Sequence, residues 1–309
     1  MIGTPGNTGV ATLRAPILAE SDALQAVWES SSAYDDPGGF SRGGWSVGAW
    51  STDTRVLVID GRTVGLAAVR AEAAPDGAMP ARIALAVDSR RADLAALLVR
   101  AVLDLVAAAG GQRARVFVPD RATWTVAAAQ AAGFQPVRTI AHMLLPAKMV
   151  TPSPLGMAGL TLRAITDGED EQVLAVLNQN WEGTWNFVSI TAAMLAEDLR
   201  GQRDGMLLAV DTADRIVGTC HAIFEPEDRN PDGNPRAWIS NLTVDPAWRG
   251  RGVARAMLVA GIAHLRGRGA TSITLGVDAD DPAPFRLYQS VGFGIVTRMQ
   301  AWDRAVPTA

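Results

Sequence analysis

The sequence contains very little cysteine and lysine, and it has no long uninterrupted apolar run. Its one cysteine, Cys220, excludes an internal disulfide and a thiolate-rich metal site. No segment approaches the roughly 20 apolar residues of a membrane-spanning helix. The first residues also lack the basic and apolar regions of a secretory signal. We therefore expect a cytoplasmic protein with no membrane partner and no bound metal.

The charges are too evenly balanced to indicate a nucleic-acid-binding protein. The 28 basic and 32 acidic residues give a net charge of -4, and Lys148 is the only lysine. Binding to nucleic acid by bulk electrostatics usually requires a strongly basic surface. The 309 residues, 48% of them hydrophobic, are enough for about two domains with sizeable cores.

Weak internal similarity indicates that one fold occurs twice. TLRA at 12–15 recurs at 161–164, LAVD at 85–88 matches LTVD at 242–245, and GF at 133–134 recurs at 292–293. The order of these matches is the same in both halves, as expected for a repeat. The segment AKMVTPSPLGMAG has two prolines and two glycines, which favour a linker. We predict domains at 1–148 and 160–309, joined by a linker at 149–159.

Strand and helix patterns alternate in the second copy. Apolar periodicity predicts strands at 160–165, 205–211, 215–225, 236–244, 272–278 and 294–302, and helices at 169–181, from about 253, and at 282–291. Helices between mostly adjacent strands predict a mixed α/β (α+β) fold. Each copy is then a mainly antiparallel twisted sheet flanked by helices.

The turn VDPAWRGRGVA, residues 244–254, has features of an anion site. The first N–H groups of a helix lack intrahelical partners and carry partial positive charge. Gly250 and Gly252 let the backbone approach a phosphate without a Cβ, while Arg249 and Arg251 add charge. The turn matches neither GxxxxGK[ST] nor GxGxxG, so the P-loop and dinucleotide fingerprints are excluded. The sequence predicts a phosphate or pyrophosphate carrier as ligand.

Two motifs in order resemble the GNAT superfamily of acyl-CoA N-acyltransferases. The turn resembles the R/Q-x-x-G-x-G/A signature, and DDPAPFRLYQSVGF at 280–293 resembles a second family segment. The resemblance covers residues 160–303 and implies acetyl-CoA as cosubstrate, with direct acyl transfer to a primary amine of a small molecule. It implies Tyr288 as the general acid that protonates the thiolate. The implied cofactor-binding residues are Leu242, Thr243, Val244, Arg249, Gly250, Arg251, Gly252, Val253, Ala254 and Asp281.

The segment QNWEGTWNFVS lies where the family places a loop that lines the acceptor site. The resemblance implies acceptor contacts from Trp181, Glu182, Trp185 and Phe187. Aromatic rings could hold an apolar or sugar-like body while Glu182 receives an ammonium. Because large aromatic side chains also serve cores and interfaces, packing between the two copies is an equal alternative.

The sequence does not identify the general base of the reaction. The strand before Val-Asp-Pro often carries a glutamate in this family, but Ser240 and Asn241 stand there, and Asp281 replaces a common asparagine. The candidates are Glu182, Glu225, Glu227 and His221; an amine that arrives deprotonated needs none. The missing base leaves a non-catalytic acyl-CoA-binding sensor or partner module as the alternative function.

The first copy lacks the corresponding machinery. Its turn, VDSRRADLAALL, is shortened and contains no glycine, and Ala129 stands where Tyr288 would be. The layout resembles the tandem-domain mycothiol synthases, but Trp238 is near the place of their glutamate, so their substrate is not carried over. A homodimer is compatible with this layout.

A third class, a hydrolase, rests on GWSVG at 44–48. This segment matches G-x-S-x-G, but the elbow needs a helix after Ser46, and the following residues predict a turn and a strand.

Overall fold

The computed structural model describes residues 10–35, 53–70, 73–149, 157–229 and 233–306. The GWSVG segment around Ser46, which the sequence disfavours as a nucleophile elbow, and most of the expected linker lie outside these ranges. The chain divides into two compact units. Unit 1 comprises Met1–Ile140 and Thr297–Ala309, and unit 2 comprises Ala141–Val296.

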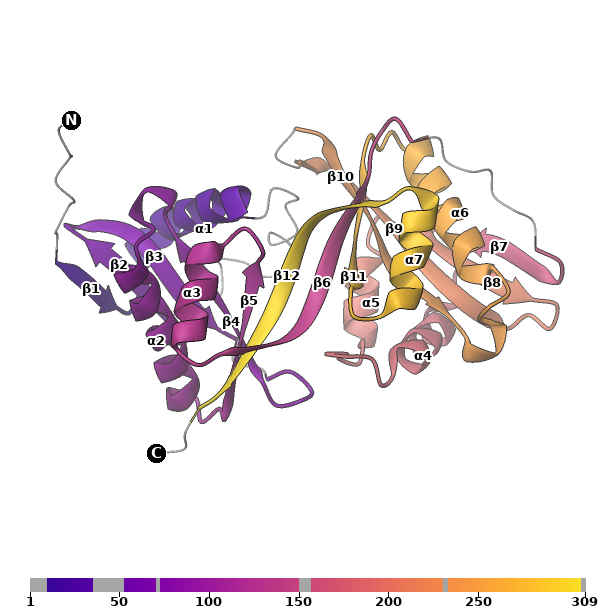
Figure 1. Cartoon of the computed structure of the whole chain (residues 1–309). Helices are drawn as coiled ribbons and strands as arrows, with labels where there is room; N and C mark the ends of the chain where they lie inside the picture. The colour runs from indigo at the N-terminus through magenta and orange to yellow at the C-terminus, as the bar shows by residue number, and fades with distance from the viewer. Residues whose placement is uncertain (1–9, 36–52, 71–72, 150–156, 230–232, 307–309) are drawn as a thin grey trace. The chain divides into compact units, whose positions relative to one another are not determined.

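Unit 1 is a mixed sheet with helices α1, α2 and α3 (Figure 1). Its strand order is β1-β2-β3-β4-β5-β12, antiparallel from β1 to β4 and parallel between β4 and β5. The elements are β1 (Ala11–Arg14), α1 (Ser21–Asp35), β2 (Thr54–Ile59), β3 (Arg62–Val69), β4 (Met79–Leu85), α2 (Ala92–Ala108), β5 (Arg113–Pro119), α3 (Thr123–Ala131) and β12 (Gly294–Ala305), with short 3-10 turns at Leu18–Glu20 and Val87–Ser89.

Unit 2 has a corresponding strand order, and its described residues form four helices. Its strands run β6-β11-β10-β9-β8-β7, antiparallel from β7 to β10 and parallel between β10 and β11. The elements are β6 (Gln135–Leu145), β7 (Leu160–Ala164), α4 (Asp170–Trp181), α5 (Ala192–Asp198), β8 (Met206–Asp211), β9 (Ile216–Arg229), β10 (Pro235–Val244), α6 (Val253–Gly267), β11 (Ile273–Asp278) and α7 (Pro282–Val291), with 3-10 turns at Arg203–Gly205 and Pro246–Trp248. Strand β6 belongs to unit 2 from Ala141 onward, and β12 belongs to unit 1 from Thr297 onward. The mixed α/β fold predicted from the sequence is confirmed. Helix α5 was not predicted.

The repeat is visible in a duplicated ion pair. Arg14 at the end of β1 lies 2.5 Å from Glu20, and Arg163 near the end of β7 lies 2.5 Å from Glu169. In each copy the glutamate also accepts a backbone N–H three residues before it, from Ile17 or Thr166. The pair therefore fixes the turn between the first strand and the first helix of each unit in the same way.

The bounds of the two units differ from the predicted domain boundaries at the last strand of each copy. Ala141, Met143 and Leu145 of β6 are buried in the core of unit 2, although they precede the predicted linker. At the other end, β12 pairs with β5 from Met299 opposite Pro119 to Ala305 opposite Arg113. The structure thus assigns 141–148 to unit 2 and 297–309 to unit 1. Alternating apolar residues specify which face of a strand is buried, but not which copy of the sheet it joins.

Helix α6 packs closely on the sheet of unit 2. A Cβ at Gly261 would lie 2.9 Å from both the Cys220 sulfur and the Ile239 side chain, so only glycine allows this approach. Around it, Met257, Leu258 and other apolar residues of α6 join one buried cluster. Among the described residues, no helix has the length and apolar character needed to cross a membrane.

Candidate active site

The turn before α6 leaves the start of that helix without a side-chain cap. Gly252 is the N-cap, with φ +85°, and Gly250 has φ +74°. A Cβ on either glycine would have no protein atom within 4 Å. Glycine is therefore required at both positions because of the left-handed backbone conformation, which residues with a Cβ rarely adopt. The first amides of α6 therefore have no side-chain cap, which is the feature that an anion site at a helix start uses.

The two arginines of the turn have different surroundings. Arg249 donates from Nε to the main-chain carbonyl of Val244 at 3.0 Å, so its side chain braces the turn against the end of β10. The Arg251 guanidinium lies 5.1 Å from the Trp248 ring centre. The sequence predicted charge from both residues; the structure adds a bracing contact for Arg249 that the motif did not indicate.

Strand β10 is irregular next to this turn. Ser240 pairs with His221 and Thr243 pairs with Thr219, so two residues of β10 face Cys220 alone on β9. This arrangement is a β-bulge, and Asn241 within it has φ +47°. On the other side, β10 pairs with β11 at Trp238 opposite Thr274, and the two strands diverge beyond that pair. The bulge thereby leaves Asn241 and Leu242, directly before Thr243, outside the regular pairing of β10 with β9.

Helix α7 carries the predicted general acid. Tyr288 is 8% exposed and meets Phe293 edge-on, with ring centres 6.1 Å apart. Burial, with a smaller contribution from neighbouring Cys220, raises the pKa of Tyr288. The phenol therefore keeps its proton throughout the neutral range. Asp281, predicted to contact the cofactor, is the N-cap of α7, where its carboxylate accepts from the Ala283 N–H at 3.0 Å.

The predicted acceptor residues follow directly on α4. Trp181 is the last residue of the helix, Glu182 is its exposed C-cap, and Trp185 and Phe187 are half-buried in the following turn. Within the described part of the chain, the buried Trp181 indole N–H has no hydrogen-bond partner. The contact of these four residues with an acceptor stays a prediction.

Asn178 closes this segment, a role that sequence reasoning missed. Its side-chain amide donates to the Ile190 carbonyl at 3.0 Å and accepts from the Ile190 N–H at 2.8 Å. Both bonds hold the far end of the turn against α4. An asparagine in a helix is often only a solvated residue, so its type and spacing gave no signal for this contact.

A second asparagine links α4 to the bulged strand. Asn180 donates from Nδ2 to Thr243 Oγ1 at 3.1 Å, and the Thr243 and Thr219 hydroxyls lie 2.9 Å apart. Thr219 Oγ1 also donates to the Asn241 carbonyl at 2.9 Å. This network connects the acceptor segment to the bulge, a link that the motifs did not indicate.

The four candidates for the base have unequal environments. Glu182 and Glu227 are exposed, and Glu225 is half-buried near the start of β10, opposite Arg236. His221 is fully buried, and neither ring nitrogen has a hydrogen-bond partner among the described residues. Burial lowers the pKa of His221 to about 4, so the ring is neutral and a weak base. The described residues contain no cluster of metal-binding side chains.

The comparisons with known proteins agree with this geometry. The profile described as Acetyltransferase (GNAT) family matches residues 171–293. A mycothiol acetyltransferase from Actinosynnema mirum is 30% identical over 244 residues, which are 76% of this chain and 77% of that protein. The chain belongs to the GNAT family of acetyltransferases.

Other relatives are matched over less of their length. The mycothiol acetyltransferase from Saccharopolyspora erythraea is 32% identical over 48% of this chain, and the match spans 46% of that protein. Among solved structures, a GCN5-related N-acetyltransferase from Sphaerobacter thermophilus has a TM-score of 0.75 at 20% identity, covering 97% of each chain. A tandem GNAT protein from the clavulanic acid biosynthesis pathway has a TM-score of 0.67 at 18% identity, covering 97% of this chain and 100% of that one. The tandem layout predicted from the repeat is therefore confirmed.

Proposed function

We propose that unit 2 transfers an acetyl group from acetyl-CoA directly to a primary amine of a small molecule. The observation that carries this proposal is the uncapped start of α6 behind a turn with two left-handed glycines. Uncapped amides and the helix dipole suit a diphosphate. A cosubstrate held there would extend along the diverging edge of β10 toward the bulge.

The bulged strand supplies the second requirement of the reaction. An amine attacking the thioester carbonyl creates a negative oxygen, which must be met by donors already in place. A backbone N–H of Leu242 or Thr243 is our candidate donor, since the bulge turns this part of β10 out of regular pairing. The network from Asn180 to Thr243 holds this backbone in position.

Tyr288 supplies the remaining chemistry, and Cys220 takes no part in it. As the carbon–sulfur bond breaks, the thiolate takes the phenolic proton, and the nitrogen loses its extra proton to the phenolate or to water. No covalent enzyme intermediate is required. Burial raises the pKa of Cys220 to about 12, so this thiol is a poor nucleophile.

The test replaces Tyr288 by phenylalanine, with Tyr34→Phe as a matched control. These are the only two tyrosines, and Tyr34 lies in unit 1 with 59% exposure. Transfer to a panel of primary amines should fall by roughly 10²–10⁴ in kcat for Tyr288→Phe, as expected for lost general acid catalysis. Calorimetry should show unchanged coenzyme A binding. Equal activity of Tyr288→Phe and Tyr34→Phe would remove Tyr288 from the mechanism.

A non-catalytic acyl-CoA-binding module is the second candidate. It is favoured by Trp238 near the place where related enzymes carry a glutamate, and by the weak basicity of buried His221. Tight coenzyme A binding without acylation of any amine in the panel, including at alkaline pH where amines are neutral, would support it. Acylation that increases with pH would instead support an amine that arrives deprotonated.

We also propose that unit 1 has no coenzyme site and that the protein acts in the cytoplasm without nucleic-acid or membrane partners. The mild negative charge supports the absence of a nucleic-acid partner. Coenzyme titration should give one equivalent per chain. We also propose a homodimer, which sedimentation would test. The ratio of bound coenzyme to chain should be the same for a monomer and for a dimer.

A further inference from the structure

Unit 1 retains the diverging pair of strands that unit 2 has at its bulge. Strands β4 and β5 pair from Met79 opposite Ala114 to Ala81 opposite Val116, and then separate. A cavity of about 30 Å³ lies at this divergence. Its lining includes Asp35 of α1, Arg82 of β4, Phe117 of β5 and Trp124 of α3.

The shortened turn of unit 1 is not suited to a diphosphate. Only residues 89–91 separate Asp88 from the start of α2, whereas residues 246–252 separate Asp245 from the start of α6. The turn of unit 1 is therefore four residues shorter than the turn of unit 2. The carboxylate of Asp93 in the first turn of α2 is paired with Arg91 and also with the helix's own first amides, which lower its pKa. An anion supplied by the chain itself thus occupies the helix start. A ligand of this cavity would not be a coenzyme A derivative.

Asp35 is bonded through only one of its two oxygens. Oδ2 accepts from Arg90 Nη2 at 2.8 Å, Ser31 Oγ at 3.3 Å and Trp124 Nε1 at 3.4 Å. The side chain is 6% exposed. Oδ1 is buried and has no hydrogen-bond partner in the ranges that the structure describes. Three donors therefore fix the orientation of the carboxylate and leave one acceptor oxygen unused.

The neighbouring cation, Arg90, is held by Asp35 and by two aromatic rings, while its buried Nε has no hydrogen-bond partner among the described residues. Arg90 lies over the rings of Tyr34 and Trp124, 4.6 and 5.5 Å from their centres, and its contact with Asp35 is through one nitrogen. Burial raises the pKa of Asp35, and Arg90 offsets this only in part. An unsatisfied buried acceptor costs free energy, and a charged donor compensates it better than a neutral one.

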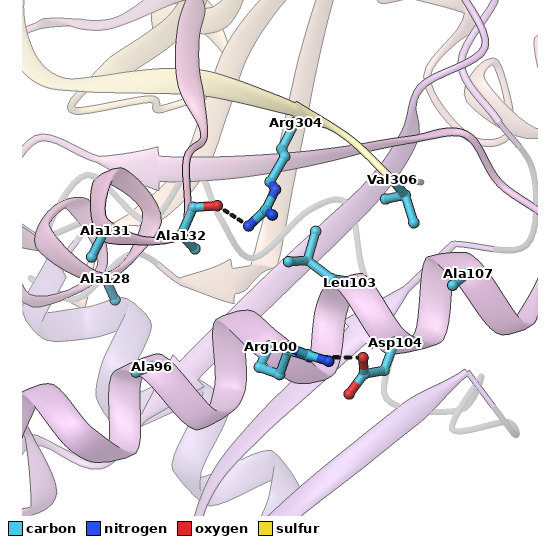
Figure 2. A pocket seen from close by; sticks show the side chains of 10 residues that line it. All are labelled: Ala96, Arg100, Leu103, Asp104, Ala107, Ala128, Ala131, Ala132, Arg304 and Val306. Atoms are coloured by element: carbon cyan, nitrogen blue, oxygen red, sulfur yellow. Dashed lines mark hydrogen bonds and ion pairs between the residues drawn. The ribbon is translucent and has the colours of Figure 1, made fainter. Parts of the chain in front are cut away.

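A larger cavity of unit 1 offers a contrast. It measures about 460 Å³ and lies between α2, α3 and the end of β12 (Figure 2). Arg100 pairs with Asp104 at 3.0 Å, and Arg304 donates to the Ala132 carbonyl. The rest of its lining is alanine, leucine and valine. Because its charged groups are already paired with each other or with a carbonyl, this cavity indicates no particular ligand.

We propose that the small cavity of unit 1 binds the terminal ammonium of a small primary amine, with Asp35 Oδ1 as its acceptor. Because one water needs about 10–15 Å³ of such volume, the space suits roughly two non-hydrogen atoms. Phe117 lines the same cavity and offers apolar surface to the attached carbon, whereas the Trp28 ring is covered by the Arg82 guanidinium, 5.6 Å from its centre. This would be a second ligand site, in a different unit from the acetyl-transfer site.

The test uses the full chain labelled with ¹⁵N in tryptophan and methylammonium as the probe. The Trp124 indole N–H, assigned through Trp124→Phe, reports on Asp35 because it donates to the same carboxylate. Methylammonium should shift this resonance saturably, while methanol of the same heavy-atom count and sodium chloride at equal ionic strength should not. A matching shift with methanol or sodium chloride would overturn the proposal.

Variants separate the cavity from other sites. Asp35→Asn keeps the shape of the side chain and should weaken methylammonium binding by at least about ten-fold, since it loses a charge-assisted bond. Asp104→Asn, an exposed carboxylate in the same unit, should respond like the parent. If Asp35→Asn does not fold, Ser32→Val, which narrows the cavity and keeps Asp35, should abolish the shift. An unchanged response in whichever of the two variants folds would overturn the proposal.

Discussion

Arg115 and Asp303, 188 positions apart in the chain, form a two-pronged ion pair with both nitrogen–oxygen distances at 2.7 Å. The Arg115 side chain is 2% exposed and also bonds Asp76 at 2.6 Å. Asp303 lies directly opposite Arg115 in the pairing of β12 with β5. The pair therefore ties the end of the chain to the core of unit 1.

We expect Asp303→Ala to destabilise unit 1 by about 3–5 kcal/mol, because it leaves a buried guanidinium without its main partner. Urea denaturation followed by near-ultraviolet circular dichroism measures the loss. Asp104→Ala, which removes an exposed pair with Arg100, should cost no more than about 1 kcal/mol. Similar costs for the two variants would show that the pair does not anchor β12.

Gly252→Ala should weaken coenzyme A binding by roughly ten-fold. Alanine at φ +85° costs about 1–2 kcal/mol, and relief of that strain would move the amides at the start of α6. Gly267→Ala is the control, since that glycine ends the same helix with open space around it and no positive φ. Isothermal titration calorimetry compares the two. Parent-like affinity in Gly252→Ala would place the diphosphate elsewhere.

Asn178→Ala should raise the KM for the amine several-fold and leave coenzyme affinity unchanged. The variant removes both bonds to Ile190, each worth about 1 kcal/mol, and so releases the acceptor segment from α4. Steady-state kinetics with varied amine, together with coenzyme titration, provide the measurement. An unchanged KM for every accepted amine would separate this segment from acceptor binding.

His221 should make the protein less stable in mild acid. The unfolded chain takes up a proton on this residue below pH about 6.5, whereas the folded chain does so only below about 4. The contribution is present above pH 6.5 and declines between those values, by up to about 3 kcal/mol. Unfolding measured from pH 7.5 to 4.5 should show a shallower slope for His221→Leu than for the parent. Parallel curves would mean that the buried ring does not resist protonation.

Several features of the site could be predicted from the sequence because they depend on local geometry. Gly250 and Gly252 were expected at a special turn, and both have positive φ. Ala129 was expected as the counterpart of Tyr288, and their carbonyls accept equivalent bonds from Phe134 and Phe293. Each of these depends on residues close together in the chain.

Other features required contacts between distant residues. Nothing near Arg249 in the motif indicates that its side chain bonds the Val244 carbonyl. Asn178 and Asn180 resemble solvated helix residues until Ile190 and Thr243 are brought beside them. The choice of acceptor contacts and of the base therefore stays a prediction.

The sequence by itself determined the repeat, the mixed α/β elements and the left-handed glycine turn, because periodicity and backbone preference act over a few residues. Only the tertiary structure decided that 141–145 belong to unit 2 and that β12 joins unit 1. Both copies end in a strand of the same pattern, so either strand suits either sheet locally. The assignment appears only when Asp303 meets Arg115 and when Met143 is buried in the core of unit 2.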